Sequence, residues 1–132
     1  MRERSAAHLW LDVLETEDHL SFDDVAGACG LEPLGRGWVE LDRQRASEFL
    51  TAILHKDLAY KVEVMPEARA RWLSEEFVRA FGEHGSRFAT NSADLPATFP
   101  FQWTPATAFT FDAGVVILGS AAAGLLWVAD ED

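Results

Sequence analysis

The chain has 132 residues, of which 22 are Asp or Glu and 11 are Lys or Arg, so its formal net charge is -11. This length suits one domain, and a hydrophobic content of 48% is enough for a buried core, which argues against intrinsic disorder. The negative charge disfavours direct binding of nucleic acid or of an anionic membrane, and it predicts a cationic partner. The single cysteine cannot form an internal disulfide, and the first residues lack the apolar stretch of a signal peptide, so we expect a cytoplasmic protein.

The first third of the chain predicts two short helices and a short strand. Residues 6–14 are expected to form an amphipathic helix. Ser21 and the acidic residues after it have the pattern of a capping box, which predicts a helix over residues 22–29 that ends at Gly30. Residues 37–41 predict a strand whose side chains alternate between two faces, with Trp38 and Glu40 opposite to Val39 and Leu41.

The middle third predicts two longer helices on either side of a strand. Asp42 is expected to cap a helix that extends to Lys56 and has the clearest apolar periodicity in the chain. Its apolar face consists of Ala46, Phe49, Leu50, Ile53 and Leu54. Residues 60–64 alternate with period two, which favours a half-buried strand, with continuation of the helix as the alternative. Pro66 suits the first turn of the next helix, whose expected apolar face consists of Ala68, Trp72, Leu73, Phe77, Ala80 and Phe81.

The last third predicts strands and loops. Residues 87–90 are expected to form a strand, and residues 91–107 a loop with three prolines. Residues 113–129 carry no charge, but the run is too short and too rich in glycine for a membrane-spanning helix, and residues 109–118 with 125–128 predict a β-hairpin. We therefore expect one α+β domain over residues 1–132, with several helices packed on one face of a small antiparallel sheet and a C-terminal β-hairpin.

The sequence contains no motif that indicates a metal, a cofactor or a nucleophile. The four histidines are at least 11 positions apart, a G-x-S-x-G motif is absent, and no glycine pattern fits a phosphate loop. We therefore expect a non-enzymatic protein without a cofactor or metal. One alternative is a ligand-binding or enzymatic pocket, whose side chains would be Trp103, Thr107, Thr110 and Asp112, although turn and strand-entry hydrogen bonds explain these residues more simply.

Five tryptophans are many for this length. Trp72 and Trp127 occupy apolar faces and are expected in the core. Trp38 and Trp103 lie beside glycine or proline, where an aromatic side chain can anchor a partner, although packing over an edge of the core is the simpler interpretation.

The charge is unevenly distributed along the chain. Residues 1–42 hold ten acids and three bases, residues 43–85 hold seven of each, and residues 86–132 hold five acids and one base. An acidic surface can attract a basic partner, although solubility alone also explains such a charge. The carboxylates that we expect to bind a partner are Asp12, Glu15, Glu17, Asp18, Asp23, Asp24, Asp130, Glu131 and Asp132. If the two acidic segments meet in space, they form one surface.

Several short segments resemble those of small bacterial proteins that are encoded as immunity partners of toxins. They are Asp57–Tyr60, Met65–Ala68, Thr90–Asn91, Trp103–Thr107, Thr110–Val115 and Leu126–Asp132. The resemblance covers roughly residues 45–132 and implies only a class: a small, acidic, cytosolic protein that blocks a toxin, often a cationic nuclease, without catalysis. It assigns no functional residue.

Three hypotheses follow from the sequence. The first is an immunity-type inhibitor that covers a cationic toxin with acidic patches. The second is the ligand-binding or enzymatic domain described above. The third is an inhibitor that mimics nucleic acid, which requires carboxylates spaced like phosphates along one face. The sequence leaves the oligomeric state open.

Overall fold

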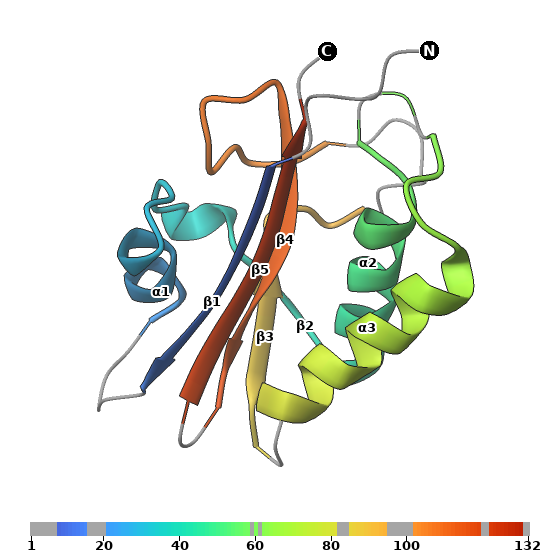
Figure 1. Cartoon of the computed structure of the whole chain (residues 1–132). Helices are drawn as coiled ribbons and strands as arrows, with labels where there is room; N and C mark the ends of the chain where they lie inside the picture. Colours follow the sequence, from blue (N-terminus) through green and yellow to red (C-terminus); the bar gives the residue numbers. More distant parts are fainter. Residues whose placement is uncertain are drawn as a thin grey trace.

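Five strands form one antiparallel sheet in the order β1-β5-β4-β3-β2 (Figure 1). The computed structural model describes residues 8–15, 21–58, 60, 62–81, 85–94, 102–119 and 122–130. The strands are β1 (His8–Glu15), β2 (Val39–Leu41), β3 (Arg87–Thr90), β4 (Phe111–Leu118) and β5 (Ala122–Asp130). The helices of the described residues are α1 (Phe22–Ala28), α2 (Arg43–His55) and α3 (Glu67–Phe81), with a short 3-10 turn at Gly35–Gly37. The predicted α+β domain with a C-terminal hairpin is confirmed.

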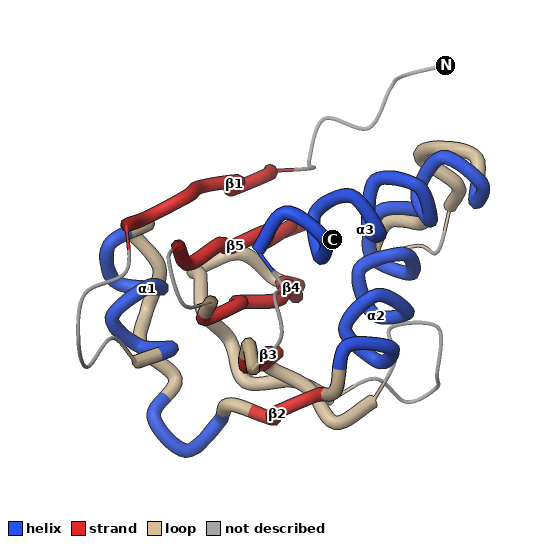
Figure 2. The backbone as a smooth tube through the Cα atoms, turned by 90° about the horizontal axis from the view of Figure 1, so that it is seen from below, coloured by secondary structure: helices blue, strands red, loops and turns tan. Residues whose placement is uncertain are grey.

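Helices lie on both faces of the sheet, as Figures 1 and 2 show. Val115 and Ile117 of β4 pack beneath α2 and α3, whereas Val116 and, on β5, Trp127 pack beneath α1. The expectation that the helices share one face therefore holds for α2 and α3 only. Because β4 and β5 carry apolar side chains on both faces, each face needs its own cover, and α1 with its following loop covers the second one.

Within the uncharged run, residues 113–118 belong to β4 and residues 122–129 to β5, as the hairpin prediction requires. Within the described residues, no helix is both long and apolar enough to cross a membrane.

The helix ends follow the sequence closely. Ser21 accepts a hydrogen bond from the amide of Asp24, and the Asp24 carboxylate accepts one from the amide of Ser21, which completes the capping box of α1. Gly30 has φ of 86°, the left-handed conformation that favours glycine after a helix. Asp42 caps α2 by accepting from the amide of Arg45 at 2.8 Å.

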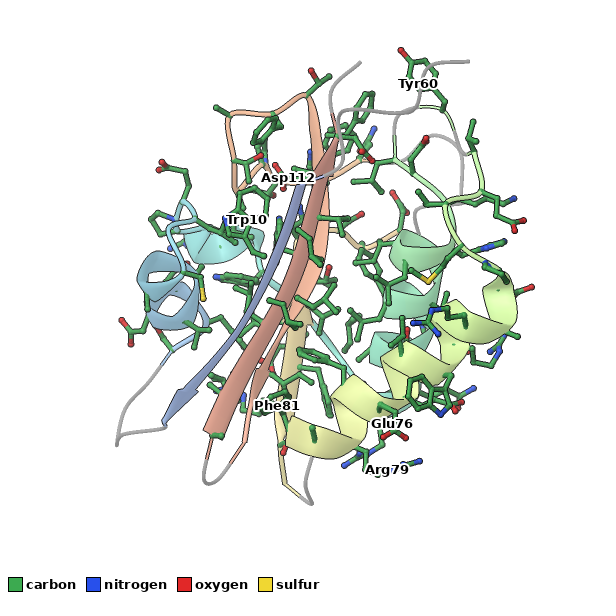
Figure 3. All side chains as sticks on the ribbon, viewed as in Figure 1. Trp10, Tyr60, Glu76, Arg79, Phe81 and Asp112 are labelled. Atoms are coloured by element: carbon green, nitrogen blue, oxygen red, sulfur yellow. The ribbon has the colours of Figure 1, made fainter. Side chains whose placement is uncertain are left out.

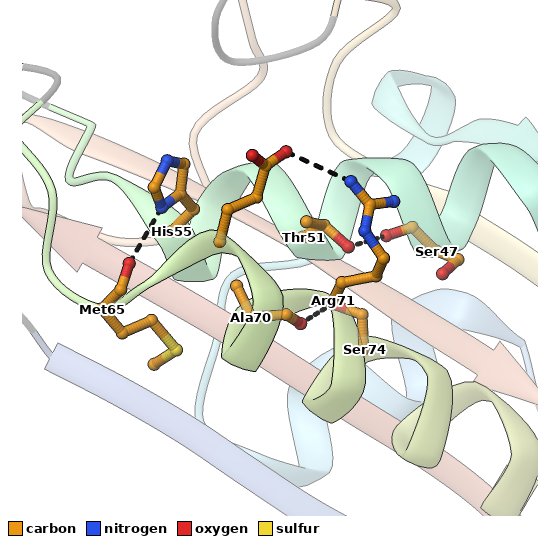
Figure 4. Close-up of polar contacts among 8 residues, drawn as sticks. Ser47, Thr51, His55, Met65, Ala70, Arg71 and Ser74 are labelled. Carbon is orange, nitrogen blue, oxygen red and sulfur yellow. Dashed lines mark hydrogen bonds and ion pairs between the residues drawn. The ribbon is translucent and has the colours of Figure 1, made fainter.

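The buried face of α2 is the predicted one, whereas that of α3 is rotated. Ala70, Ser74, Phe77 and Val78 are buried in α3, but Trp72 is 57% exposed, so its predicted place in the core is wrong. The rotation is possible because the Ser74 hydroxyl donates to the carbonyl of Ala70 at 2.8 Å (Figure 4), so a polar residue can face the core without an unmet donor.

Two predicted elements differ from the structure. Residues 8–15 form strand β1 instead of a helix, because they pair along their whole length with β5. Among the described residues of the segment after α2, a single bridge between Lys56 and Glu63 replaces the predicted strand, and Tyr60 points away from the sheet (Figure 3). Here the Asp57 carboxylate accepts from the amide of Tyr60 at 2.7 Å, which bends the chain into a turn.

The close contact between Gly114 and Trp127 gives a first prediction. A Cβ atom at Gly114 would lie 2.3 Å from the Trp127 ring and 2.4 Å from the Leu126 carbonyl oxygen. We expect Gly114→Ala to lower the free energy of unfolding by about 1–3 kcal/mol, because neither the backbone nor a buried indole can move away easily. Urea denaturation measures this change.

Gly27→Ala is the matched control. Gly27 lies within α1, and a Cβ atom there would meet nothing within 4 Å. Because alanine favours the helix over glycine, this variant should be neutral or more stable by up to about 1 kcal/mol. Equal effects of the two variants would contradict the packing argument.

Candidate functional site

The Asp112 side chain is fully buried in β4 and accepts hydrogen bonds on both oxygens (Figure 3 labels this residue). Oδ1 accepts from the Asn91 side chain at 3.0 Å and from the indole N–H of Trp127 at 3.2 Å. Oδ2 accepts from the amide and the hydroxyl of Thr107, at 3.1 and 2.8 Å, and the Ala106 amide contacts both oxygens. Burial of a carboxyl group is costly unless donors of this kind satisfy its oxygens.

Asn91 extends this arrangement to the end of β3. Its side-chain nitrogen donates to Asp112 Oδ1 and to the carbonyls of Asp112 and Thr104, each at 3.0 Å. The Thr104 amide in turn donates to the Asn91 carbonyl at 2.9 Å. The loop that enters β4 is thereby fixed to β3, and Ala106 is buried in the apolar cluster below α1.

Two tryptophans connect Asp112 to the start of α1. The Trp127 ring packs edge to face on Trp38, with centroids 5.9 Å apart. The Trp38 indole N–H donates to Asp23 at 2.7 Å, and Asp23 also accepts from the amides of Leu34 at 2.7 Å and Gly35 at 3.2 Å. Partial burial opposes ionisation of Asp23, but the three donors outweigh it and lower the pKa of this carboxyl below its usual value.

These contacts change the interpretation of the proposed pocket. Thr107 and Asp112 bond to each other, Thr110 is exposed, and the half-buried Trp103 packs on Phe111 with centroids 5.4 Å apart. Asp112 is therefore occupied by donors of its own chain. This geometry supports a structural role for the Asp112 side chain, in agreement with the simpler interpretation by turn and strand-entry hydrogen bonds. The packing of Trp38 also agrees with that interpretation, because its ring lies between Phe22 and Trp127.

The C-terminal acidic segment begins with a residue that is not a surface charge. Asp130 is 3% exposed and accepts from the amide of Leu58 at 2.8 Å. It also lies far from the other acidic segment, because β1 and β5 are antiparallel: Asp12 is in register with Leu125, five positions from Asp130. At about 3.3 Å per residue, that is about 17 Å along the strand. Asp130 thus does not join the β1 acids in one surface, and Glu131 and Asp132 lie outside the described residues.

The remaining candidate carboxylates belong to β1 and α1. Asp12 and Glu15 occupy β1, although their side chains, like all of Glu17 and Asp18, lie outside the described part. Asp24 is exposed on α1, and Glu32, which follows α1, is exposed as well. We call these six residues the β1–α1 acidic segment. Sequence reasoning missed Glu32, although the absence of Lys and Arg from residues 5–35 points to it.

Several charges elsewhere on the described surface are paired. Arg45 lies beside Glu48 on α2, and on α3 Arg71 pairs with Glu67 and Arg79 with Glu76 (Figures 3 and 4). Arg87 binds both carboxylate oxygens of Glu40 between β3 and β2, and this contact lowers the pKa of Glu40. Much of the charge on α2, α3 and the β2–β3 edge is therefore balanced by a neighbour of opposite sign.

Among the described residues, no group of three or more His, Cys, Asp or Glu side chains is arranged to hold a metal ion. No protein-family model, no curated protein and no solved structure matches the chain. The resemblance to immunity proteins therefore stays a prediction.

The donor set around Asp112 predicts a large effect of Asp112→Asn. The new amide nitrogen would face a donor instead of accepting from it, so the free energy of unfolding should fall by about 2–4 kcal/mol. Chemical denaturation checks this, with Glu75→Gln at an exposed position of α3 as the control for loss of an acid. Unchanged stability of Asp112→Asn would contradict the structural role and favour a ligand-binding one.

The lowered pKa of Asp23 predicts a pH-dependent contribution to stability. The folded state favours the ionised carboxylate, so this contribution is present above the unfolded pKa of about 3.9 and is lost as the pH falls through the folded pKa. Asp23→Asn should therefore cost about 1–2 kcal/mol at pH 7 and markedly less near pH 3. Urea titrations of both proteins at the two pH values measure the difference. A cost that does not change with pH would contradict the prediction.

Proposed function

We propose that this protein is a non-enzymatic inhibitor of the immunity type, which binds a cationic protein toxin through its β1–α1 acidic segment. The observation that carries the proposal is the segregation of charge. Several arginines of α2, α3 and β3 are paired with neighbouring acids, namely Arg45, Arg71, Arg79 and Arg87. By contrast, Asp24 and Glu32 are exposed in a stretch of sequence that has no Lys or Arg between Arg4 and Arg36.

The electrostatic consequence is a directional field. A paired carboxylate attracts a distant cation weakly, because its arginine cancels most of the potential beyond a Debye length of about 8–10 Å. Carboxylates without a nearby base retain their potential and increase the rate at which a basic surface arrives. A partner with a basic active site would therefore approach the β1–α1 side first.

Acidic residues that are bound within the fold can be removed from the list of candidate contact residues. Asp23 and Asp130 accept hydrogen bonds within the fold and, unlike Asp24, are partly or fully buried, so we do not assign them a direct contact with the toxin. Trp38 and Trp103 also serve packing, which leaves the exposed carboxylates as the recognition elements.

A pair of charge reversals tests the proposal. Glu32→Lys and Glu75→Lys change the net charge by the same amount, but Glu32 belongs to the acidic segment and Glu75 lies on α3. With the product of the adjacent gene as partner, Glu32→Lys should slow association by about tenfold at low salt, whereas Glu75→Lys should have little effect. Surface plasmon resonance at 50 and at 300 mM salt measures the rates.

Thermal unfolding of both variants controls for folding. Binding by the unmodified protein should weaken as salt increases, and coexpression should protect cells from the toxin. Equal effects of the two reversals, or binding that does not depend on salt, would contradict recognition by this segment. Failure of the adjacent gene product to bind, together with no salt-sensitive partner from the native host, would overturn the proposed function.

A further inference from the structure

Strand β1 is a long outer strand of the sheet. It stands last in the strand order and, among the described strands, pairs only with β5 (Figure 2). In an antiparallel pair, every second residue directs its amide and carbonyl away from the partner strand, so β1 presents a row of such groups along its eight residues. A sheet edge can serve as a template for another strand unless the edge strand is short, carries charged side chains or is covered.

The apolar side chains of β1 are exposed on the side of the sheet that α2 and α3 cover elsewhere. Leu9 and Leu11 are each 60% exposed, although they are in register with Val128 and Leu126, which belong to the apolar cluster beneath those helices. The apolar face of the sheet thus continues onto β1 beyond its cover. Two neighbouring leucines on an open edge indicate an interface.

The opposite edge does not share these properties. Strand β2 has three residues, and its exposed Glu40 forms an ion pair with Arg87 of β3. A short edge strand with charged side chains is one of the ways in which proteins prevent further pairing. Of the two outer strands, β1 is therefore the one that is long and carries exposed apolar side chains.

We propose that β1 pairs antiparallel with β1 of a second copy of the chain, about a two-fold axis that passes beside Leu11. In such an isologous contact, residue i faces residue j and residue j faces residue i. With Leu11 at the centre, Leu9 faces Val13 of the second copy and Trp10 faces Asp12, so residues 8–14 of both strands are paired.

The alternative registers fit less well. If one strand were shifted by one residue, side chains of opposite faces would lie against each other. The two-fold axis must therefore pass beside one residue and not between two. With Asp12 at the centre, the two Asp12 residues face each other, which is unfavourable for like charges. With Trp10 at the centre, only residues 8–12 of the described strand are paired. The Leu11 register keeps the exposed leucines opposite apolar residues over the longest overlap.

The pairing extends both layers of the fold. Because opposite residues of an antiparallel pair point to the same side, helices α2 and α3 of both copies lie on one side of the joined sheet and both α1 helices on the other. The dimer is independent of the proposed inhibitor function, and it would present two β1–α1 acidic segments on the same side.

The dependence on salt concentration distinguishes the dimer from the proposed inhibitor function. Each chain carries a formal charge of -11, so two copies repel each other, and added salt should strengthen the dimer, whereas it should weaken binding of a cationic toxin. Sedimentation equilibrium of the full chain should show a dimer whose dissociation constant falls between 50 and 300 mM salt. A monomer at every concentration up to the millimolar range would overturn the proposal.

A charge on the edge should disrupt the dimer. Leu11→Lys should raise the dissociation constant at least about tenfold, because pairing would bury the new ammonium group, even though it makes the net charge less negative. Val62→Lys is the control, because Val62 is similarly exposed, at 52%, but lies in the segment after α2. Equal effects of the two variants would contradict an interface on β1.

Cysteine cross-linking tests the register without disturbing the sheet. In a Cys29→Ala background, Leu11→Cys should form a disulfide with itself under mild oxidation, because opposite Cβ atoms lie about 4.5–5.5 Å apart. Leu9→Cys should cross-link to Val13→Cys in a mixture but not to itself. Cross-linking of Leu9→Cys to itself, with none of Leu11→Cys, would overturn the proposed register.

Discussion

The burial of the Asp112 carboxylate is the constraint on which one whole face of the structure depends. A charge in a dry interior costs several kcal/mol unless donors surround it. Those donors come from the end of β3, the loop before β4 and the centre of β5, through Asn91, Thr107 and Trp127. Segments that are distant in sequence must therefore meet at one point. The carboxylate specifies the path of the loop as strongly as an apolar contact would, because a displaced loop would leave it unsolvated.

Between Trp127 and the surface, a second carboxylate is satisfied by donors in the same way. Each indole places its N–H on a carboxylate, Trp127 on Asp112 and Trp38 on Asp23, and the two rings pack on each other. Two large aromatic side chains fill volume that a long helix would otherwise occupy, so the seven residues of α1 suffice on this face. The arrangement also uses acids that a simple count assigns to the surface. The net charge therefore overstates the number of carboxylates that a partner can contact.

The sequence predicts local features well and non-local ones poorly. The caps at Ser21 and Asp42, the face of α2 and the hairpin depend on neighbours within a few positions. Strand β1 depends on β5 at the other end of the chain, so its residues alone resemble a helix. The candidate site divides in the same way: the acidic stretch was visible, but the donors that bind Asp23 and Asp130 were not. An acid inside an apolar strand, as at Asp112, was the available signal of a buried network.

The position of the hairpin determines where recognition can occur. Strands β4 and β5 lie in the middle of the sheet and are covered on both faces, so their side chains are engaged in packing. We therefore expect contact with another molecule to use the helices, the loops or the two outer strands. Two acids of α3, Glu67 and Glu76, are paired and β2 is short and charged, whereas β1 is a long outer strand with two exposed leucines. The proposed dimer and the proposed contact with a cationic partner therefore both involve β1, and because one opposes like charges and the other joins opposite charges, the two proposals predict opposite effects of salt.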